Sequence, residues 1–265
     1  MRIIVPIKQV PETSAVKMDE ATGTMIREGV EAIVNPLDLY AIETALVLRE
    51  QFGGEVTVVS MGPPKADRAV REAIAMGCDR GVLLSDKAFA GSDTWATSYA
   101  LAGAIRKLGA FDLVICGERA TDGDTGQVGP GIASFLDLPV ATYVGKIESA
   151  ADGHVRVHRL VEDGHEVLDV ALPAVLTVVK AIASPRLPTL HGKRRAKAAK
   201  VPVWVPKDLA LDAAKLGLKG SPTRVVKIFK PKITRQCQKF VAGDEQAIAA
   251  AVDKLVAFLR AKALL

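Results

Sequence analysis

The chain has 265 residues, about half of them apolar and a quarter charged, which is ordinary for a globular protein able to bury one substantial core. No apolar run approaches the roughly 18 residues that a membrane-spanning helix needs, so we expect no membrane span. The opening MRIIVPIKQVPE lacks the longer apolar region and cleavage site of a signal peptide, and the three cysteines lie far apart. We therefore expect a cytoplasmic protein without a disulfide framework.

The net charge of +5 is unevenly distributed along the chain. Residues 186–239 hold 15 Lys and Arg but only two acidic residues, a charge of +13, whereas the rest of the chain carries −8. A basic segment of this kind often binds nucleic acid. This one is interrupted by five prolines and has few aromatic residues, and its charge equally suits an acidic protein surface. We expect it to bind a partner subunit and no nucleic acid.

The first part of the chain alternates between strand and helix patterns. Arg2–Ile7 is an apolar run of strand length, and residues 17–27 have the pattern of a small hairpin. Asn35-Pro36 then predicts a helix start, with Asn35 as N-cap and Pro36 in the first helical position. Apolar, non-alternating strands joined by helices predict a doubly wound, mostly parallel α/β sheet of the adenine-nucleotide-binding type. The elements expected next are strands at 55–60, 81–84 and 112–116, a helix that ends at Gly53, a proline-led helix that stops at Gly77, and a helix from Ser92 or Asp93 to Leu108.

After Pro139 the pattern changes. Residues 141–148, 155–161 and 166–170 alternate between apolar and polar side chains and are separated by Asp-Gly pairs, which predicts an antiparallel appendage. A continuous apolar run at 174–180 returns to the core, and Asp244 should cap a final amphipathic helix. We therefore expect three parts, which are an α/β nucleotide-binding domain at 1–184, an extended basic partner-binding arm with a docking loop at 185–239, and a C-terminal helix at 240–265.

A glycine-rich loop follows the buried strand that ends at Cys116-Gly117. Gly123, Gly126 and Gly129 would allow backbone N–H groups to approach a phosphate closely. The helical pattern resumes at Ile132, and the positive end of that helix would face the same anion at the carboxyl edge of the sheet. The loop therefore favours a phosphate site, although loops rich in Gly and Asp also serve as plain helix caps.

The polar residues of this loop divide by charge. Thr125 and Gln127 would add neutral hydrogen bonds to a phosphate. Asp122 and Asp124 would repel one, so they suit capping of the loop or binding of ribose hydroxyls. The loop contains no GKS or GKT and is not a Walker loop.

Five stretches of the chain resemble the β subunit of the electron transfer flavoprotein family. They are VPIKQVPET, VNPLDLYAIETAL, AMGCDRGVLL, CGERATDGDTGQVGP and KAIASPRLPTLHGKRRAK. The resemblance implies a heterodimer with an α subunit that carries a mobile, electron-transferring FAD. It also implies a nucleotide in the β subunit, which is AMP in one branch of the family and a second FAD in the other.

Two stretches bear on the branch. The compact DGDTGQVGP and the stretch RLPTLHGK look closer to the branch whose β subunit holds FAD and bifurcates electrons from NADH, with AMP as the alternative. Implied partners are an acyl-CoA dehydrogenase or other flavin dehydrogenase, and ferredoxin or flavodoxin as a low-potential acceptor. Ala183-Ser184 departs from the family, in which relatives of both branches often have Asn-Glu, and this departure bears on the turn of the docking loop.

The family's contacts map onto strand ends and helix starts at one edge of the predicted sheet. Chemistry would belong to the flavin, so we expect no catalytic side chain in this chain. Asn35 suits an N-cap with or without a ligand, and Met61 can simply pack on a ring edge. The implied cofactor-binding residues are Pro6, Asn35, Pro36, Leu37, Asp38, Met61, Gly117, Asp122, Gly123, Asp124, Thr125, Gly126, Gln127, Val128 and Gly129. The implied docking residues are Leu187, Leu190, Lys193 and Arg194, with Leu190 as an apolar tip that can fill a partner's pocket.

Two other readings of the sequence are weaker. His154, His158 and His165 share a predicted hairpin, but no Cys or further convergent ligand completes a metal site, so we expect none. A stand-alone nucleotide-binding regulatory module would use the same scaffold. Such a module needs neither the basic arm nor the terminal helix, and these two features favour the subunit of a complex.

Overall fold

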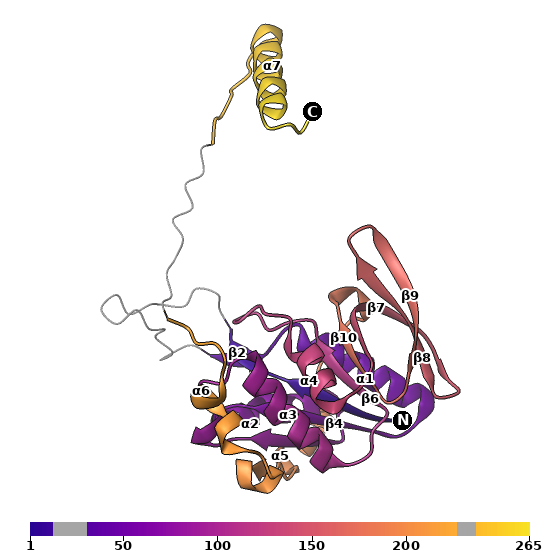
Figure 1. The fold of residues 1–265 in the computed structure, drawn as a ribbon. Helices are drawn as coiled ribbons and strands as arrows, with labels where there is room; N and C mark the ends of the chain where they lie inside the picture. The colour runs from indigo at the N-terminus through magenta and orange to yellow at the C-terminus, as the bar shows by residue number, and fades with distance from the viewer. Residues whose placement is uncertain (13–30, 227–236) are drawn as a thin grey trace. The chain divides into compact units, whose positions relative to one another are not determined.

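The structure is a computed structural model that describes residues 1–12, 31–226 and 237–265. The hairpin expected at 17–27 lies outside these residues. The chain divides into two compact units, Met1–Lys227 and Ile228–Leu265, and each is described by itself (Figure 1).

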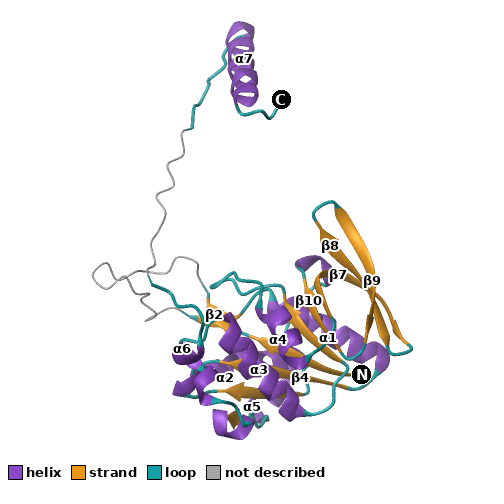
Figure 2. Cartoon of the chain, in the orientation of Figure 1, coloured by secondary structure: helices purple, strands orange, loops and turns teal. Residues whose placement is uncertain are grey.

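The first unit is built on a nine-stranded sheet with the order β11-β5-β4-β1-β6-β10-β7-β8-β9. Figure 2 shows its strands among the helices of the body. Every neighbouring pair from β11 to β7 is parallel, and the pairs β7–β8 and β8–β9 are antiparallel. The expected strands at the start of the chain share this sheet, which confirms the parallel α/β prediction. The parallel strands are β1 (Arg2–Ile7), β4 (Glu55–Met61), β5 (Arg80–Leu84), β6 (Leu113–Gly117) and β10 (Ala174–Val178).

Helices cover both faces of the parallel strands. Side chains on a strand alternate between faces, and Val5 of β1 belongs to one core whereas Ile4 belongs to the other. The first core contains α1 (Asp38–Phe52) and α2 (Asp67–Met76), and the second contains α3 (Thr94–Leu108) and α4 (Val128–Leu136). The sheet is therefore doubly wound, as predicted.

The antiparallel appendage extends the same sheet. It consists of β7 (Val140–Ala151), β8 (His154–Val161) and β9 (Gly164–Ala171), joined by tight turns. Val155 and Val157 of β8 are fully buried in the first core, so one face of the appendage packs on the body while the other faces water. The short elements are β2 (Gln9–Pro11), β3 (Ala32–Val34), α6 (Gly217–Gly220) and 3-10 turns at Pro64–Ala66, Lys87–Phe89, Lys180–Ile182, Pro206–Leu209 and Ala213–Lys215.

Two helix starts differ from the sequence prediction. α1 begins at Asp38, and Leu37 holds the cap position with no side-chain cap bond. Asn35 does not cap this helix, because its amide bonds elsewhere in the fold. α4 begins at Val128 rather than near Ile132, so part of the expected loop is the first turn of a helix. The third start is as predicted, since the side chain of Asp93 caps α3.

The basic segment packs on the body over much of its length, where an extended or partner-bound arm was expected. α5 (Leu190–Ala198) lies on α2 with Ala196 buried, and β11 (Val203–Trp204) adds a parallel strand beside β5. Arg195 donates to the backbone carbonyls of Ile74 and Cys78. The scattered apolar side chains thus find places on the body, and the compact unit ends at Lys227 instead of at residue 184.

The second unit contains α7 (Glu245–Ala261). Its start is as predicted, because the side chain of Asp244 accepts a hydrogen bond from the N–H of Ala247. One stripe of the helix exposes about half of each apolar side chain, and its members are Ile248, Val252, Leu255 and Phe258. None of the helices in the described ranges is both long and apolar enough to span a membrane.

Candidate functional site

The connections of the sheet diverge between β1 and β6. From β1 the chain passes through α1 to β4 on one side, and from β5 it crosses through α3 to β6 on the other side of β1. In open α/β sheets, ligands bind at such a switch point, beyond the carboxyl ends of the strands. Two segments meet here, the described residues around Lys8 and Asn35 that precede α1 and the loop 118–127 after β6.

Asn35 ties these two segments together. Its side chain is fully buried, and its Nδ2 donates to Oδ1 of Asp38 and to the carbonyl oxygen of Arg119, both at 2.9 Å. Its Oδ1 accepts from the N–H of Thr121 at 3.1 Å. Both polar atoms of the Asn35 amide thus have protein partners, and the side chain links the residues before α1 to the loop after β6.

Asp38 completes this anchor. Its carboxylate accepts from Asn35 and, at 2.7 Å, from the backbone N–H of Lys8. Burial raises the pKa of Asp38 to about 7, against the opposing effect of these two hydrogen bonds. A Cβ at Gly117 would collide with Oδ1 of Asp38, which explains why glycine stands where β6 passes the helix.

The glycine loop presents backbone N–H groups. Those of Gly123, Thr125, Gly126 and Gln127 have no hydrogen-bond partner among the residues that the structure describes. Gly126 has φ +64° and Asp124 has φ 53°, which turns successive peptide groups in the manner of an anion-binding nest. No side chain from the described ranges caps α4, so its N-terminus adds further free donors.

Each of the three acidic residues of the loop forms an ion pair, but with only two cations between them. Nζ of Lys8 lies 2.6 Å from Asp122, and Nε of Arg119 lies 3.2 Å from Glu118 and 3.1 Å from Asp124. The two aspartates were expected to cap the loop or to bind ribose. Sequence reasoning missed Lys8, although a charged residue directly after a buried strand at the ligand edge was a usable signal.

The remaining expected residues are spread around this edge. Pro36 and Leu37 form the turn before α1, and Met61 is the half-buried last residue of β4. Pro6 lies inside β1 and is buried, paired in register with β4. A Cβ at the buried Gly129 would lie 2.5 Å from Cγ2 of Thr177, so this glycine permits close packing between α4 and β10.

Tyr143 borders the loop and was not predicted. It has φ 57°, which is uncommon for a bulky side chain, and its N–H donates to Oγ1 of Thr177 at 3.1 Å. Its hydroxyl lies 3.8 Å from the place that a Cβ on Gly126 would occupy. Non-glycine residues with a positive φ of this kind are often found at functional sites.

The expected docking residues lie apart from this site. Leu187 and Leu190 are 85% and 82% exposed, and Lys193 and Arg194 on α5 are also exposed. The structure thus places two apolar tips and two cations on one short stretch of surface. It does not bring them to the carboxyl edge of the sheet.

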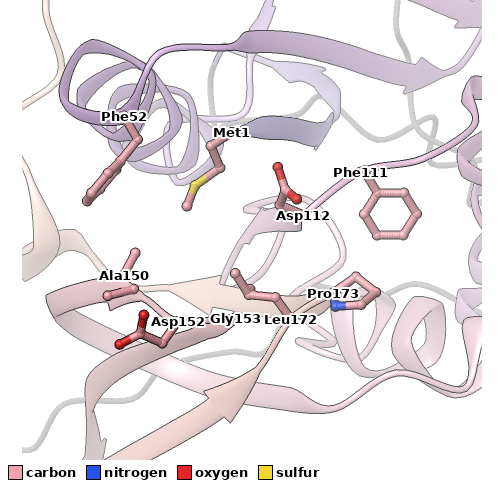
Figure 3. Close-up of a pocket in the computed structure, with 10 residues that line it drawn as sticks. Met1, Phe52, Phe111, Asp112, Ala150, Asp152, Gly153, Leu172 and Pro173 are labelled. Carbon is pink, nitrogen blue, oxygen red and sulfur yellow. The ribbon is translucent and has the colours of Figure 1, made fainter.

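A pocket of about 470 Å³ lies at the opposite edge of the sheet (Figure 3). Its walls include Met1, Phe52, Asp112 and Pro173, which come just before the parallel strands. Parallel sheets bind ligands at the carboxyl edge, so we assign the functional site to the glycine loop rather than to this pocket.

Within the described residues, no group of three or more His, Cys, Asp or Glu could hold a metal ion, and His158 pairs with Glu148.

A doubly wound sheet with a glycine loop at its switch point is typical of adenine-nucleotide-binding α/β proteins. The family model described as "Electron transfer flavoprotein domain" matches residues 22–209. The chain is 48% identical over 256 residues to the electron transfer flavoprotein subunit beta of Thermoanaerobacterium thermosaccharolyticum, covering 96% of this chain and 98% of that protein. It is 49% identical over 232 residues to the caffeyl-CoA reductase-Etf complex subunit CarD of Acetobacterium woodii, with 87% and 88% covered, and 46% identical over 259 residues to the protein FixA of Azorhizobium caulinodans, with 95% and 92% covered.

The chain therefore belongs to the electron transfer flavoprotein family, as the β-type subunit, and functions in electron transfer.

Proposed function

We propose that this subunit binds FAD at the switch point between β1 and β6 and takes part in flavin-based electron bifurcation with an α subunit. The observation that carries the nucleotide site is the set of N–H groups of Gly123, Thr125, Gly126 and Gln127, which have no partner among the described residues and stand directly before the start of α4. Donors arranged in this way suit the diphosphate of FAD and equally the phosphate of AMP. The preference for FAD depends on the compact sequence DGDTGQVGP.

The residues of this chain would hold and orient the cofactor. Asn35 and Asp38 fix the loop, so that its N–H groups point at the phosphates without reorganisation when the nucleotide binds. The chemistry that FAD would supply at this site is hydride acceptance and one-electron transfer. The two electrons of a hydride from NADH would go one to the α-subunit FAD and one to ferredoxin or flavodoxin, with the proton released to solvent. The protein contributes position and local charge, and no side chain of the site is assigned a catalytic step.

The partners follow from the family. CarD is by its name a subunit of a complex with a caffeyl-CoA reductase. For this chain we propose an α subunit as constant partner and an acyl-CoA or other flavin dehydrogenase that docks at Leu187, Leu190, Lys193 and Arg194. Their exposure and positive charge suit an acidic surface with an apolar pocket. We propose the cytoplasm as the location, since Cys78 and Cys116 are buried free thiols.

The test is a cofactor count on the purified heterodimer. We expect two flavins per heterodimer and reduction by NADH. One flavin with AMP would make this a conventional electron shuttle, and absence of any adenine nucleotide from the β subunit would overturn the proposed site.

A pair of glycine variants locates the nucleotide. Gly126→Val introduces a side chain at φ +64° in the loop, and Gly153→Val introduces the same side chain at φ +75° in the β7–β8 turn. The similar positive φ matches the backbone strain of the two variants. A Cβ at Gly126 would make only ordinary contacts, the nearest 3.5 Å from the carbonyl oxygen of Glu118, and a Cβ at Gly153 would meet no described atom within 4 Å. We expect Gly126→Val to lose the β nucleotide and keep the α flavin, and Gly153→Val to keep both.

A further inference from the structure

We infer that Lys8 is a phosphate-binding residue of the nucleotide site, whose ammonium group exchanges Asp122 for the nucleotide phosphate when the ligand binds. This inference rests on the proposed nucleotide site. It assigns to a single cation the charge that the uncharged backbone N–H groups of the glycine loop do not supply.

The backbone of Lys8 is fixed at the switch point. Its N–H donates to Oδ2 of the buried Asp38 at 2.7 Å, and its carbonyl oxygen accepts from the N–H of Asn35 at 2.8 Å. Asn35 and Asp38 in turn hold the loop after β6. The Cα of Lys8 and the glycine loop are thus parts of one hydrogen-bonded frame, and only the side chain of Lys8 is free to turn.

The side chain of Lys8 reaches across the switch point to the loop. Its Nζ lies 2.6 Å from Oδ1 of Asp122, the residue directly before Gly123, where the free N–H groups begin. The ammonium group therefore lies next to the first residue of the segment whose N–H groups would hold an anion. A flexible ammonium suits phosphate as a mobile point charge.

The ion pair between Lys8 and Asp122 is easily exchanged. The two side chains are 47% and 28% exposed, and a pair so open to solvent contributes at most about 1 kcal/mol. A nucleotide phosphate carries up to two negative charges, so it attracts the ammonium more strongly than one carboxylate does. Arg119, the other basic residue of the loop, is as exposed as Lys8 but is shared between two carboxylates, those of Glu118 and Asp124, so a phosphate would have to replace two partners rather than one.

Without Lys8, the acidic loop would oppose an anionic ligand. Asp122 and Asp124 lie on either side of Gly123, and Lys8 is the cation that neutralises Asp122. Replacing Lys8 by Met therefore removes an attraction to phosphate and also exposes a repulsion. If the ion pair of Lys8 and Asp122 only held the loop in place, its loss would weaken the binding of charged and uncharged ligands alike.

The experiment compares AMP with adenosine on the full heterodimer after removal of bound nucleotide. AMP carries the adenine, the ribose and a phosphate common to both candidate cofactors, and adenosine lacks only the phosphate. For Lys8→Met we expect the affinity for AMP, measured by titration calorimetry, to fall about 10- to 100-fold, the range for a charge-assisted hydrogen bond. Affinity for adenosine should stay within about twofold by the same reasoning.

Two further variants sharpen the result. Lys146→Met removes the same charge from an exposed residue of β7 and should leave both affinities unchanged. Asp122→Asn frees Lys8 and should tighten AMP without weakening adenosine. A loss of adenosine binding in Asp122→Asn would assign this carboxylate to the ribose and overturn the exchange.

The outcomes separate this inference from the proposed function. If the wild-type heterodimer binds neither AMP nor adenosine, the nucleotide site itself is wrong. If it binds AMP and Lys8→Met binds AMP equally well, the site stands and the role of Lys8 is overturned. Equal losses for AMP and adenosine in Lys8→Met would likewise overturn it, because they would make Lys8 a support of the loop rather than a phosphate ligand.

Discussion

Replacing Arg186 with Ala should destabilise the body of this protein strongly, although the residue stands in a segment of high positive charge. Arg186 donates from its backbone N–H and from Nε to Oε2 of Glu43, both at 2.9 Å, and from Nη2 to Oε1 at 2.9 Å. Its guanidinium also bonds Glu50. These contacts hold the pKa of Arg186 above its ordinary value and lower the pKa of Glu50. Arg186 thereby fastens the start of the basic segment 186–239 to α1.

The magnitude depends mainly on how deeply Glu43 is buried. Its side chain is only 8% exposed, so Arg186→Ala leaves a nearly buried carboxylate without its charged partner. Breaking such a pair costs about 3 to 5 kcal/mol, and we take about 3 because the arginine itself is 32% exposed. For a unit of this size, a loss of about 3 kcal/mol lowers the Tm by roughly 6 to 12 °C.

Thermal unfolding of the heterodimer measures this effect. Arg194→Ala removes the same kind of side chain from an exposed position of α5 and serves as the control, with a shift of less than about 2 °C. Glu50→Gln should also shift the Tm only slightly, because half of the Glu50 side chain is exposed. Equal shifts for Arg186→Ala and Arg194→Ala would refute the reasoning.

Three further expectations follow from the structure. Gly129→Ala places a Cβ 2.5 Å from Cγ2 of Thr177 and should lower the free energy of unfolding by about 1 to 3 kcal/mol. Gly123→Ala meets no described atom within 4 Å and should leave it unchanged. A larger loss of stability in Gly123→Ala than in Gly129→Ala would contradict the packing. The pKa of Asp38 is raised from 3.8 to about 7 in the folded state, so its contribution to stability is full below about pH 4 and is lost as the pH rises through 7. The difference in unfolding free energy between wild type and Asp38→Ala should therefore fall across that window, and a pH-independent difference would show that the carboxyl is not perturbed. Leu190→Ala removes an 82% exposed side chain, so it should slow electron transfer to the partner dehydrogenase without changing the flavin content, and lost flavin would instead show a structural role.

The sequence predicted well what local pattern determines. Apolar runs with glycine or Asp-Gly boundaries gave the strands and most of the helices, because burial and turn geometry act within a few residues. The start of α1 was misplaced, since Asn35 is a favoured cap by its local preference while tertiary hydrogen bonds to Asp38, Arg119 and Thr121 use its amide instead. Packing of the basic segment was missed for a related reason. Its charge predicted self-repulsion, but Arg195 and Arg71 are held by backbone carbonyls between the segment and α2, which no composition reveals.

In the candidate site, too, local features could be predicted from the sequence and tertiary contacts could not. The glycine loop is visible in the sequence because its residue types are contiguous. The pairing of Lys8 with Asp122 is not, because 114 positions separate them and only the order of the sheet brings their strands together. Knowledge that β1 and β6 are neighbours would have sufficed to suspect the pair.

α1 connects the two surfaces on which the proposed functions depend. At its start, Asp38 and the preceding Asn35 hold the loop after β6, and further along, Glu43 and Glu50 hold Arg186 at the beginning of the basic segment. Each anchor includes a buried carboxylate of α1, Asp38 in the first and Glu43 in the second, so damage to either reduces the stability of the whole unit. A fall in electron transfer alone therefore does not tell which surface a substitution has altered. Nucleotide content reports on the anchor at Asn35 and affinity for the partner reports on the anchor at Arg186, and the two roles separate only when both are measured on the same variant.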